Sequence, residues 1–225
     1  MYQETKTHEI TVDVVIFTIK NGELQVLLVQ RGKEPYKNKW AIPGGFVRLS
    51  ENLDEAAKRL LYEKSNLKDV YLEQIYTFGD PLRYPNSRVI TVAYFALIRS
   101  ESLILKFDKA ADVLKDVKWH SIYKLPELAF DHEKIVKYAY KKLRDDLEYS
   151  AIAFQLLPKK FTLTELQKAY ETILHKTLDK RNFRKKMISL DILIELDEYT
   201  KNSSKRPAKL YMFNENNSMH KDFEL

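Results

Sequence analysis

The chain has 225 residues, 44% hydrophobic and 31% charged, so it can build a packed core under a solvated surface in one large domain or two modest ones. It has a formal net charge of +6 and no cysteine, which excludes disulfides and thiolate metal sites. Met1–Glu9 is polar and no uncharged apolar run reaches about 18 residues, so we expect no signal peptide, no membrane span and a cytoplasmic protein.

The first part of the chain alternates strand and helix patterns. Glu9–Lys20 is rich in Val, Ile and Thr and predicts a strand, which Asn21-Gly22 turns into a hairpin with Leu24–Gln30. Asn52, with Glu55 three residues on, indicates a capped helix to about Ser65. Apolar spacing predicts three more strands and a helix, at Val70–Phe78, Val89–Ile98, Val113–His120 and Asp131–Tyr149.

The last third of the chain, after a predicted linker near Tyr149–Lys160, has a different pattern of helix and strand signals. Thr162 and Glu165 fit a capping box, which predicts a helix to about Leu174. A turn, a helix over Asp179–Leu190, a strand, a basic loop and a strand follow, in the order of a winged helix-turn-helix. Lys159–Lys209 holds 13 Lys and Arg against 7 Asp and Glu, an excess equal to the whole net charge. This indicates a polyanionic partner, although a solvated helical face would look the same.

The second predicted helix of this segment separates into two faces. Phe183, Met187 and Leu190 recur at inward positions, which turns the cations of the helix outward, as a reader of the DNA major groove requires. The polar loop after the helix is the expected wing. The candidate DNA contacts are Thr162, Thr164, Lys180, Arg181, Asn182, Arg184, Lys185, Lys201, Ser204, Lys205 and Arg206.

A spaced motif follows the first hairpin. Its residues are Gly45, Glu51, Arg59, Leu61, Glu63 and Leu67. The motif resembles the signature of the Nudix hydrolases, over roughly residues 9–145. That resemblance implies an α/β sandwich, a mixed sheet between helices. Leu60 and Lys64 stand where the family has metal-binding Glu residues, and Asn66 replaces its usual Gly.

These departures bear on catalysis. Helix positions 60, 63 and 64 share one face, and Mg²⁺ prefers oxygen ligands in near-octahedral array. Glu63 offers a carboxylate at these positions, but Leu60 is apolar and Lys64 carries an ammonium group, so the three residues do not provide the oxygen ligands. We therefore expect no metal, no cofactor, no catalytic residue and no enzymatic activity, with Glu51 and Arg59 kept as braces of the loop and helix.

A fold without catalysis still has a pocket. We expect polar and aromatic residues of the Nudix cleft to bind a small sugar through ring faces and charged groups, although each alone fits a core aromatic or a surface ion pair equally well. The candidate effector-binding residues are Asp13, Trp40, Arg48, Tyr76, Asp80, Arg83, Arg88 and Tyr94.

The two parts together resemble the Nudix-related bacterial transcriptional regulators, in which a Nudix-like effector domain (here 1–150) precedes a winged helix-turn-helix (here 151–225). The run from Phe161 to Arg184 carries this resemblance. Some members sense ADP-ribose and control NAD metabolism, whereas others sense a sugar and control pentose use. The lost metal set favours the second group, and the chain is similar to its arabinose-responsive regulators.

The resulting hypothesis is a homodimeric repressor of sugar utilisation that binds double-stranded, palindromic operator DNA and is released by an effector, L-arabinose. Three alternatives stay open at this point. They are an ADP-ribose-sensing regulator of NAD metabolism, an active Nudix hydrolase tethered to nucleic acid, and a non-DNA interaction module such as an RNA binder.

Overall fold

The computed structural model describes residues 8–65, 70–99, 114–200 and 207–214. The chain forms two compact units. The first comprises Met1–Phe17, Gln25–Leu97 and Ser102–Tyr140, and the second comprises Thr18–Leu24, Ile98–Glu101 and Lys141–Leu225. The division falls within one long helix, and the domain boundary placed after residue 150 from the sequence stays a prediction.

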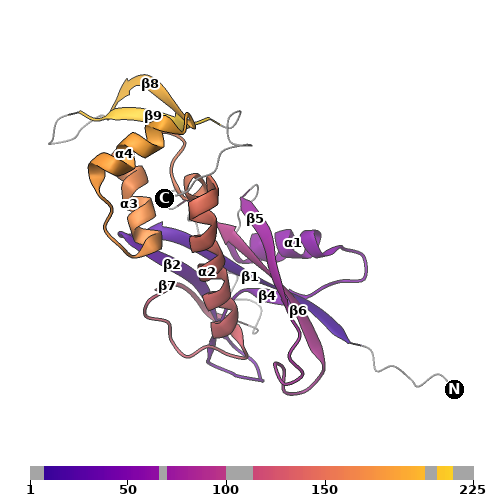
Figure 1. Ribbon diagram of the computed structural model, residues 1–225. Helices are drawn as coiled ribbons and strands as arrows, with labels where there is room; N and C mark the ends of the chain where they lie inside the picture. The colour runs from indigo at the N-terminus through magenta and orange to yellow at the C-terminus, as the bar shows by residue number, and fades with distance from the viewer. Residues whose placement is uncertain (1–7, 66–69, 100–113, 201–206, 215–225) are drawn as a thin grey trace. The chain divides into compact units, whose positions relative to one another are not determined.

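The first unit contains a mixed sheet in the order β3-β2-β1-β6-β5, to which β4 and β7 add through β1 and β2 (Figure 1). The strands are β1 (Glu9–Lys20), β2 (Glu23–Arg31), β3 (Trp40–Ala41), β4 (Gly44–Phe46), β5 (Tyr71–Phe78), β6 (Val89–Leu97) and β7 (Leu114–Ser121). The β1–β6 pair is parallel, and β5 and β6 run antiparallel. The hairpin prediction is confirmed, because Asn21 and Gly22 both have positive φ, as the tight turn requires.

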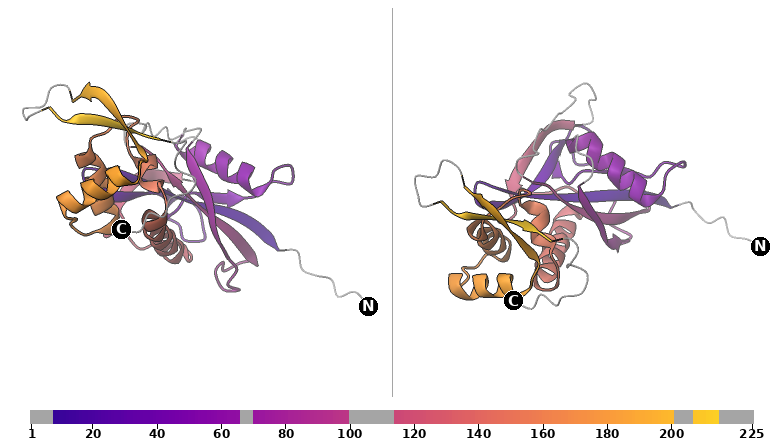
Figure 2. Two further views of the ribbon diagram at one scale, coloured as in Figure 1. Left: turned by 45° about the horizontal axis from the view of Figure 1, so that its top comes forward. Right: turned by 90° about the horizontal axis from the view of Figure 1, so that it is seen from above.

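Helix α1 (Leu53–Ser65) and the first half of α2 (His132–Tyr149) cover opposite faces of this sheet (Figures 1 and 2). Both are amphipathic. The inward residues of α2, at four-residue spacing, are fully buried: Ile135, Ala139, Leu143 and Leu147. In α1, Leu60 is also buried, and an added Cβ on Gly45 would come within 2.9 Å of its Cδ2 atom. The predicted sandwich, with a mixed sheet between helices, is therefore confirmed.

The second unit contains a short 3-10 helix η2 (Ile152–Leu156), α3 (Leu163–Leu174), α4 (Lys180–Ser189) and the hairpin of β8 (Leu193–Tyr199) and β9 (Lys209–Phe213). Thr162 and Glu165 form the capping box of α3, and Asp179 caps α4, as the sequence indicates. His175 ends α3 in the left-handed region. These elements have the order of a winged helix-turn-helix, so the predicted fold class is confirmed for this unit too.

The α3–α4 core explains why the two helices pack as a pair. Tyr170 of α3 is fully buried and meets the edge of the Phe183 ring of α4, with ring centroids 5.3 Å apart. Met187, one turn further along α4, is also buried. Within the part of the chain that the structure describes, no helix is long and apolar enough to cross a membrane.

Candidate functional site

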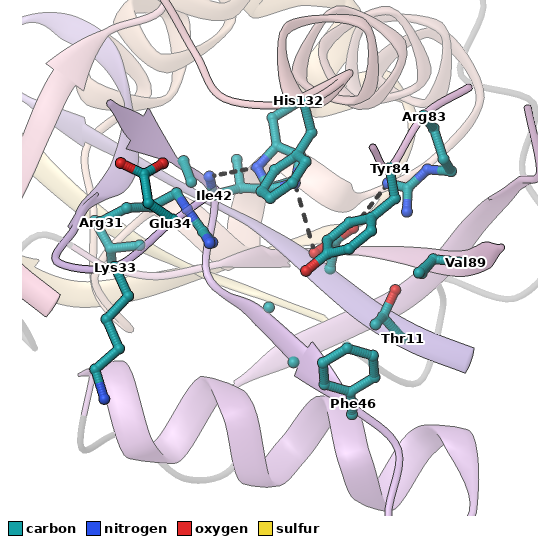
Figure 3. Close-up of a pocket in the computed structure, with 16 residues that line it drawn as sticks. Thr11, Arg31, Lys33, Glu34, Ile42, Phe46, Arg83, Tyr84, Val89 and His132 are labelled. Carbon is teal, nitrogen blue, oxygen red and sulfur yellow. Dashed lines mark hydrogen bonds and ion pairs between the residues drawn. The ribbon is translucent and has the colours of Figure 1, made fainter. Parts of the chain in front are cut away.

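A pocket of about 370 Å³ opens in the first unit. Its lining comes from segments far apart in the chain: β1, the end of β2 and the loop after it, β4, the loop before β6, and the start of α2 (Figure 3). Its polar and aromatic lining residues are Thr11, Asp13, Arg31, Lys33, Glu34, Phe46, Arg83, Tyr84, Phe130 and His132. Figure 3 shows His132, Tyr84 and Arg83 gathered in one part of the pocket, with Lys33 and Phe46 nearer to α1.

Arg83 holds the floor of the pocket together. Its side chain is 4% exposed, and its Nε and Nη2 donate to the two carboxylate oxygens of Asp131 at 3.0 and 2.8 Å. Nη2 also donates to Asp13 Oδ2 over a longer 3.4 Å. Buried charges persist when they are paired and hydrogen-bonded, so this arrangement fixes all three side chains.

Gly44 makes room for the Asp13 carboxylate. The two residues face each other in the β1–β4 register. A Cβ at position 44 would lie 2.0 Å from Asp13 Oδ1, closer than any non-bonded contact allows. Gly44 of the Pro43-Gly44-Gly45 segment is therefore needed for the shape of the pocket, because any residue with a side chain at this position would displace the Asp13 carboxylate.

His132 is the other polar group of the floor. The backbone N–H of Ile42 donates to its Nδ1 at 3.1 Å, so the neutral ring carries its proton on Nε2. Burial lowers the pKa of His132 below its usual value, which favours the neutral ring. Its Nε2 lies 3.9 Å from Asp13 Oδ1, beyond hydrogen-bond distance.

An aromatic column borders the floor. The rings of Tyr84 and Phe130 stack with centroids 5.2 Å apart, and the guanidinium carbon of Arg31 lies 4.7 Å from the Phe130 centroid. Arg31 Nε donates to the carbonyl of Pro35 at 2.8 Å, and burial lowers the pKa of Arg31. Lys33 and Phe46 of the lining are exposed, so a charged and an aromatic group remain accessible to a ligand.

Of the eight effector-binding residues expected from the sequence, Asp13 and Arg83 line this pocket, and the other six do not. Trp40 packs against His120, with ring centroids 4.6 Å apart. Tyr94 is buried and donates to Asp54 at 2.6 Å, and burial raises its pKa. Tyr76 belongs to an aromatic cluster at the surface.

The remaining three are held by polar contacts elsewhere. Arg48 is exposed and lies 3.6 Å from Glu63. Asp80 Oδ1 accepts from the N–H of Leu82 at 2.8 Å, which closes a turn. The backbone carbonyl of Arg88 accepts from the N–H of Glu9. Sequence reasoning missed Arg31, Lys33, Tyr84, Phe130 and His132. Their one local signal is position: Arg31 ends β2, His132 begins α2, and the other three lie in bends and turns, where binding residues often lie.

The Nudix-like motif forms a brace. Arg59 Nε and Nη2 donate to the two carboxylate oxygens of Glu51 at 2.8 and 2.5 Å, and Nη2 also donates to the carbonyl of Phe46 at 3.2 Å. Hydrogen bonds from Arg59 and from the backbone of Arg48 hold the pKa of Glu51 at about 2. These contacts join the loop to α1, as expected from the sequence.

The described residues around this motif differ from the carboxylate set that the Nudix resemblance implies. Leu60 is buried and apolar, and Glu63 lies 3.3 Å from Arg59. Within the described ranges, no group of three His, Asp or Glu side chains is placed to hold a metal ion. The side chain of Lys64 lies outside the described part of the structure.

The Glu51–Arg59 pair has a testable effect on acid stability. Because the pKa of Glu51 is depressed in the folded state, its contribution is present above the unfolded value near 4.5 and is lost as the pH falls toward about 2. We expect Glu51→Gln to lower the free energy of unfolding at pH 7 and to flatten its decline between these two values, measured by urea denaturation. Glu133→Gln, in an exposed pair with Lys137, should change neither. An unaltered pH profile in Glu51→Gln would show that the brace does not stabilise the fold.

In the second unit, α4 buries Phe183 and Met187 and turns three of its cations outward. Lys180, Arg181 and Lys185 are exposed, and the structure shows no ion pair between them and any described residue. Free cations on the outer face of the second helix match the requirement for contacts to phosphates and base edges.

The other expected DNA contacts have different surroundings. Arg184 is half-buried, and its Nη2 donates to Thr164 Oγ1 of α3 at 3.0 Å. Thr162 is buried, and its hydroxyl group bonds to Glu165 within the capping box. Asn182 is exposed in the first turn of α4. The wing residues Lys201, Ser204, Lys205 and Arg206 lie outside the described residues.

Comparisons with known proteins match both units. The NUDIX domain family matches residues 8–140, and the NrtR DNA-binding winged helix domain matches residues 153–213. A relative from Acinetobacter baylyi, described as an ADPR responsive transcriptional repressor, is 40% identical over 90% of this chain and 81% of its own length. Shewanella oneidensis NrtR in complex with a 27mer DNA has a TM-score of 0.80 at 33% identity, over 92% of this chain and 94% of that one.

A further solved structure bears on the effector. The NUDIX domain of Shewanella oneidensis NrtR complexed with ADP ribose aligns with a TM-score of 0.54 at 34% identity, over 63% of this chain and 94% of that one. The expectations of an L-arabinose effector, of a role in sugar utilisation and of particular closeness to arabinose-responsive regulators are therefore wrong. The physical reason is plain: losing metal ligands removes a route to hydrolysis but does not change which molecule the pocket binds.

Proposed function

The chain belongs to the NrtR family of Nudix-domain transcriptional repressors, and from this we propose that it represses transcription by binding operator DNA and leaves the operator when it binds ADP-ribose. In this proposal the first unit is the sensor and the second is the DNA reader. A homodimer on a palindromic operator is part of the proposal, since paired half-sites are the usual geometry of helix-turn-helix proteins.

The observation that carries the sensor assignment is the mixed chemistry of the pocket. Its lining includes Arg31 and Lys33, which suit a diphosphate, and the exposed ring of Phe46, which suits a nucleobase. The buried polar floor, with Asp13 and His132, suits hydroxyl groups. ADP-ribose carries all three kinds of group, whereas a free pentose would leave the cations and the ring unused.

The reader assignment rests on α4. Its buried face fixes the helix against α3, and its outer face presents Lys180, Arg181 and Lys185 to solvent. Such a helix can bind in the major groove, with Arg able to bond guanine through two N–H groups and Lys able to neutralise phosphates.

A selection experiment tests both assignments. Duplexes enriched from a random library by the full chain would be labelled and titrated by fluorescence anisotropy, beside a scrambled duplex. We expect the enriched duplex to bind at least about a thousandfold more tightly, and ADP-ribose to weaken it by about five- to 150-fold. By linkage, the duplex must weaken ADP-ribose binding by the same factor. Equal binding of both duplexes, or no response to ADP-ribose, would refute the proposal.

We also expect the chain not to hydrolyse ADP-ribose. Leu60 is buried where a carboxylate would be needed, and Glu51 and Glu63 both contact Arg59. Incubation of pure protein with ADP-ribose and Mg²⁺, followed by chromatography for AMP, should show no turnover above a protein-free blank. An active Nudix ADP-ribose pyrophosphatase is the positive control. AMP formation that needs both Mg²⁺ and this protein would favour the hydrolase alternative.

A further inference from the structure

We propose that Asp13 and His132 form a subsite that recognises one ribose hydroxyl of the nucleotide ligand, and that Asp13 thereby sets ligand specificity. The inference rests on the proposed function. It concerns which atoms of the ligand the pocket floor selects, and it follows from three features of that floor.

The first feature is that the buried Asp13 carboxylate is poorly satisfied. The residue is 5% exposed, yet within the described structure the one hydrogen bond that its carboxylate accepts is the 3.4 Å contact from Arg83, whose shorter bonds go to Asp131. No described residue donates a hydrogen bond to Oδ1, and His132 Nε2 lies 3.9 Å from it. Because Asp13 lines the pocket, the free acceptor position of Oδ1 is available to a donor group of a ligand.

The second feature is the spacing between Asp13 and His132. With Nδ1 occupied by the Ile42 N–H, Nε2 offers a proton toward the pocket. A gap of 3.9 Å is too long for a direct hydrogen bond between Nε2 and Oδ1. One oxygen atom can nevertheless lie about 2.8 Å from both.

The third feature is the kind of atom that satisfies both groups at once. A carboxylate accepts and does not donate, and the Nε2–H donates. The bridging group must therefore accept from His132 and donate to Asp13, which a hydroxyl does. A phosphate oxygen would be repelled by the carboxylate, and a carbonyl has no proton to give.

Calorimetry with ADP-ribose and with analogues that each lack one ribose hydroxyl tests the subsite. We expect the unmodified chain to lose about tenfold to a hundredfold in affinity for one of these analogues, because a hydrogen bond to a charged acceptor is lost. In Asp13→Asn the same analogue and ADP-ribose should bind within about threefold of each other. Equal affinity of the unmodified chain for every analogue would overturn the subsite without any reliance on a variant.

Asp131→Asn is the matched control, because Asp131 also bonds Arg83 but does not line the pocket. It should keep the preference for the complete ligand, whatever its effect on overall affinity. Circular dichroism confirms that each variant is folded. Retention of the full preference in Asp13→Asn would show that the Asp13 carboxylate does not recognise the hydroxyl and would overturn the subsite. Equal loss of the preference in Asp131→Asn would assign the effect to charge balance around Arg83 and would also overturn it. If the unmodified chain binds no ADP-ribose at all, the proposed function fails and this inference fails with it.

Discussion

Replacing Arg83 with Met should destabilise the first unit by about 3–5 kcal/mol, a large fraction of the stability of an ordinary domain. The guanidinium is 4% exposed and lies between Asp13 and Asp131, whose side chains are 7% and 17% exposed. Methionine fills similar space but would leave two carboxylates facing each other without a cation. Removing one member of a buried charge set costs far more than the net contribution of the set, because the remaining charges stay desolvated.

Urea denaturation of the variant at neutral pH, with the unmodified chain beside it, provides the measurement. Arg48→Met is the matched control, since Arg48 makes an exposed ion pair with Glu63 and should cost less than about 1 kcal/mol. If the two variants lose the same free energy of unfolding, the Arg83 cluster is not a structural element of the pocket. A large loss for Arg83→Met alone would show that the cluster stabilises the folded chain in the absence of ligand.

Local chemistry made much of the fold predictable. The capping residues Thr162 and Asp179, the turn at Asn21-Gly22 and the apolar spacing of α2 act within a few residues, so the sequence alone reveals them. The short strands β3 and β4 had no such signal. They form because they pair with β2 and β1, which is a long-range condition.

The pocket was harder to predict for the same reason. Asp13 and Arg83 could be found as charged residues in or near apolar strands and turns. The cluster that they form with His132 could not, because its members come from β1, a loop and the start of a helix that are far apart in the sequence. Trp40 and Tyr94 have the chemistry of ligand contacts, yet the sheet turns them toward His120 and Asp54. Side-chain direction depends on register and tertiary packing, and residue type does not reveal it.

Arg184 is a helical residue whose side-chain direction also differs from the one expected from the sequence. The expected side chain points outward, but position 184 lies three residues before Met187 and so beside the buried face, and the structure half-buries it against Thr164. The reason is that α3 packs beside α4 and supplies a hydroxyl acceptor within reach of the guanidinium. Arg181 has no such neighbour among the described residues, so it is the stronger candidate for a contact with base edges.

Replacing Arg181 with Ala should weaken binding to the enriched duplex by about 1–3 kcal/mol and relax the preference at one base-pair position. An exposed Arg near the start of α4 can reach two acceptors of a guanine, and the methyl group of Ala can reach neither. Binding to a scrambled duplex should change little by comparison, because that complex depends on phosphate contacts. Fluorescence anisotropy with both duplexes at several salt concentrations provides the measurement.

Lys185→Ala is the control variant that distinguishes recognition of a base pair from general attraction to the DNA phosphates. Lys185 is exposed on the same helix, and a lysine that neutralises a phosphate should weaken both duplexes alike and reduce the salt slope by about 1. ADP-ribose binding to the free protein should be unchanged in both variants, since neither residue lines the pocket. If Arg181→Ala behaves as Lys185→Ala does, Arg181 contacts the backbone and base recognition lies elsewhere. If neither variant differs from the unmodified chain, α4 is not the recognition helix.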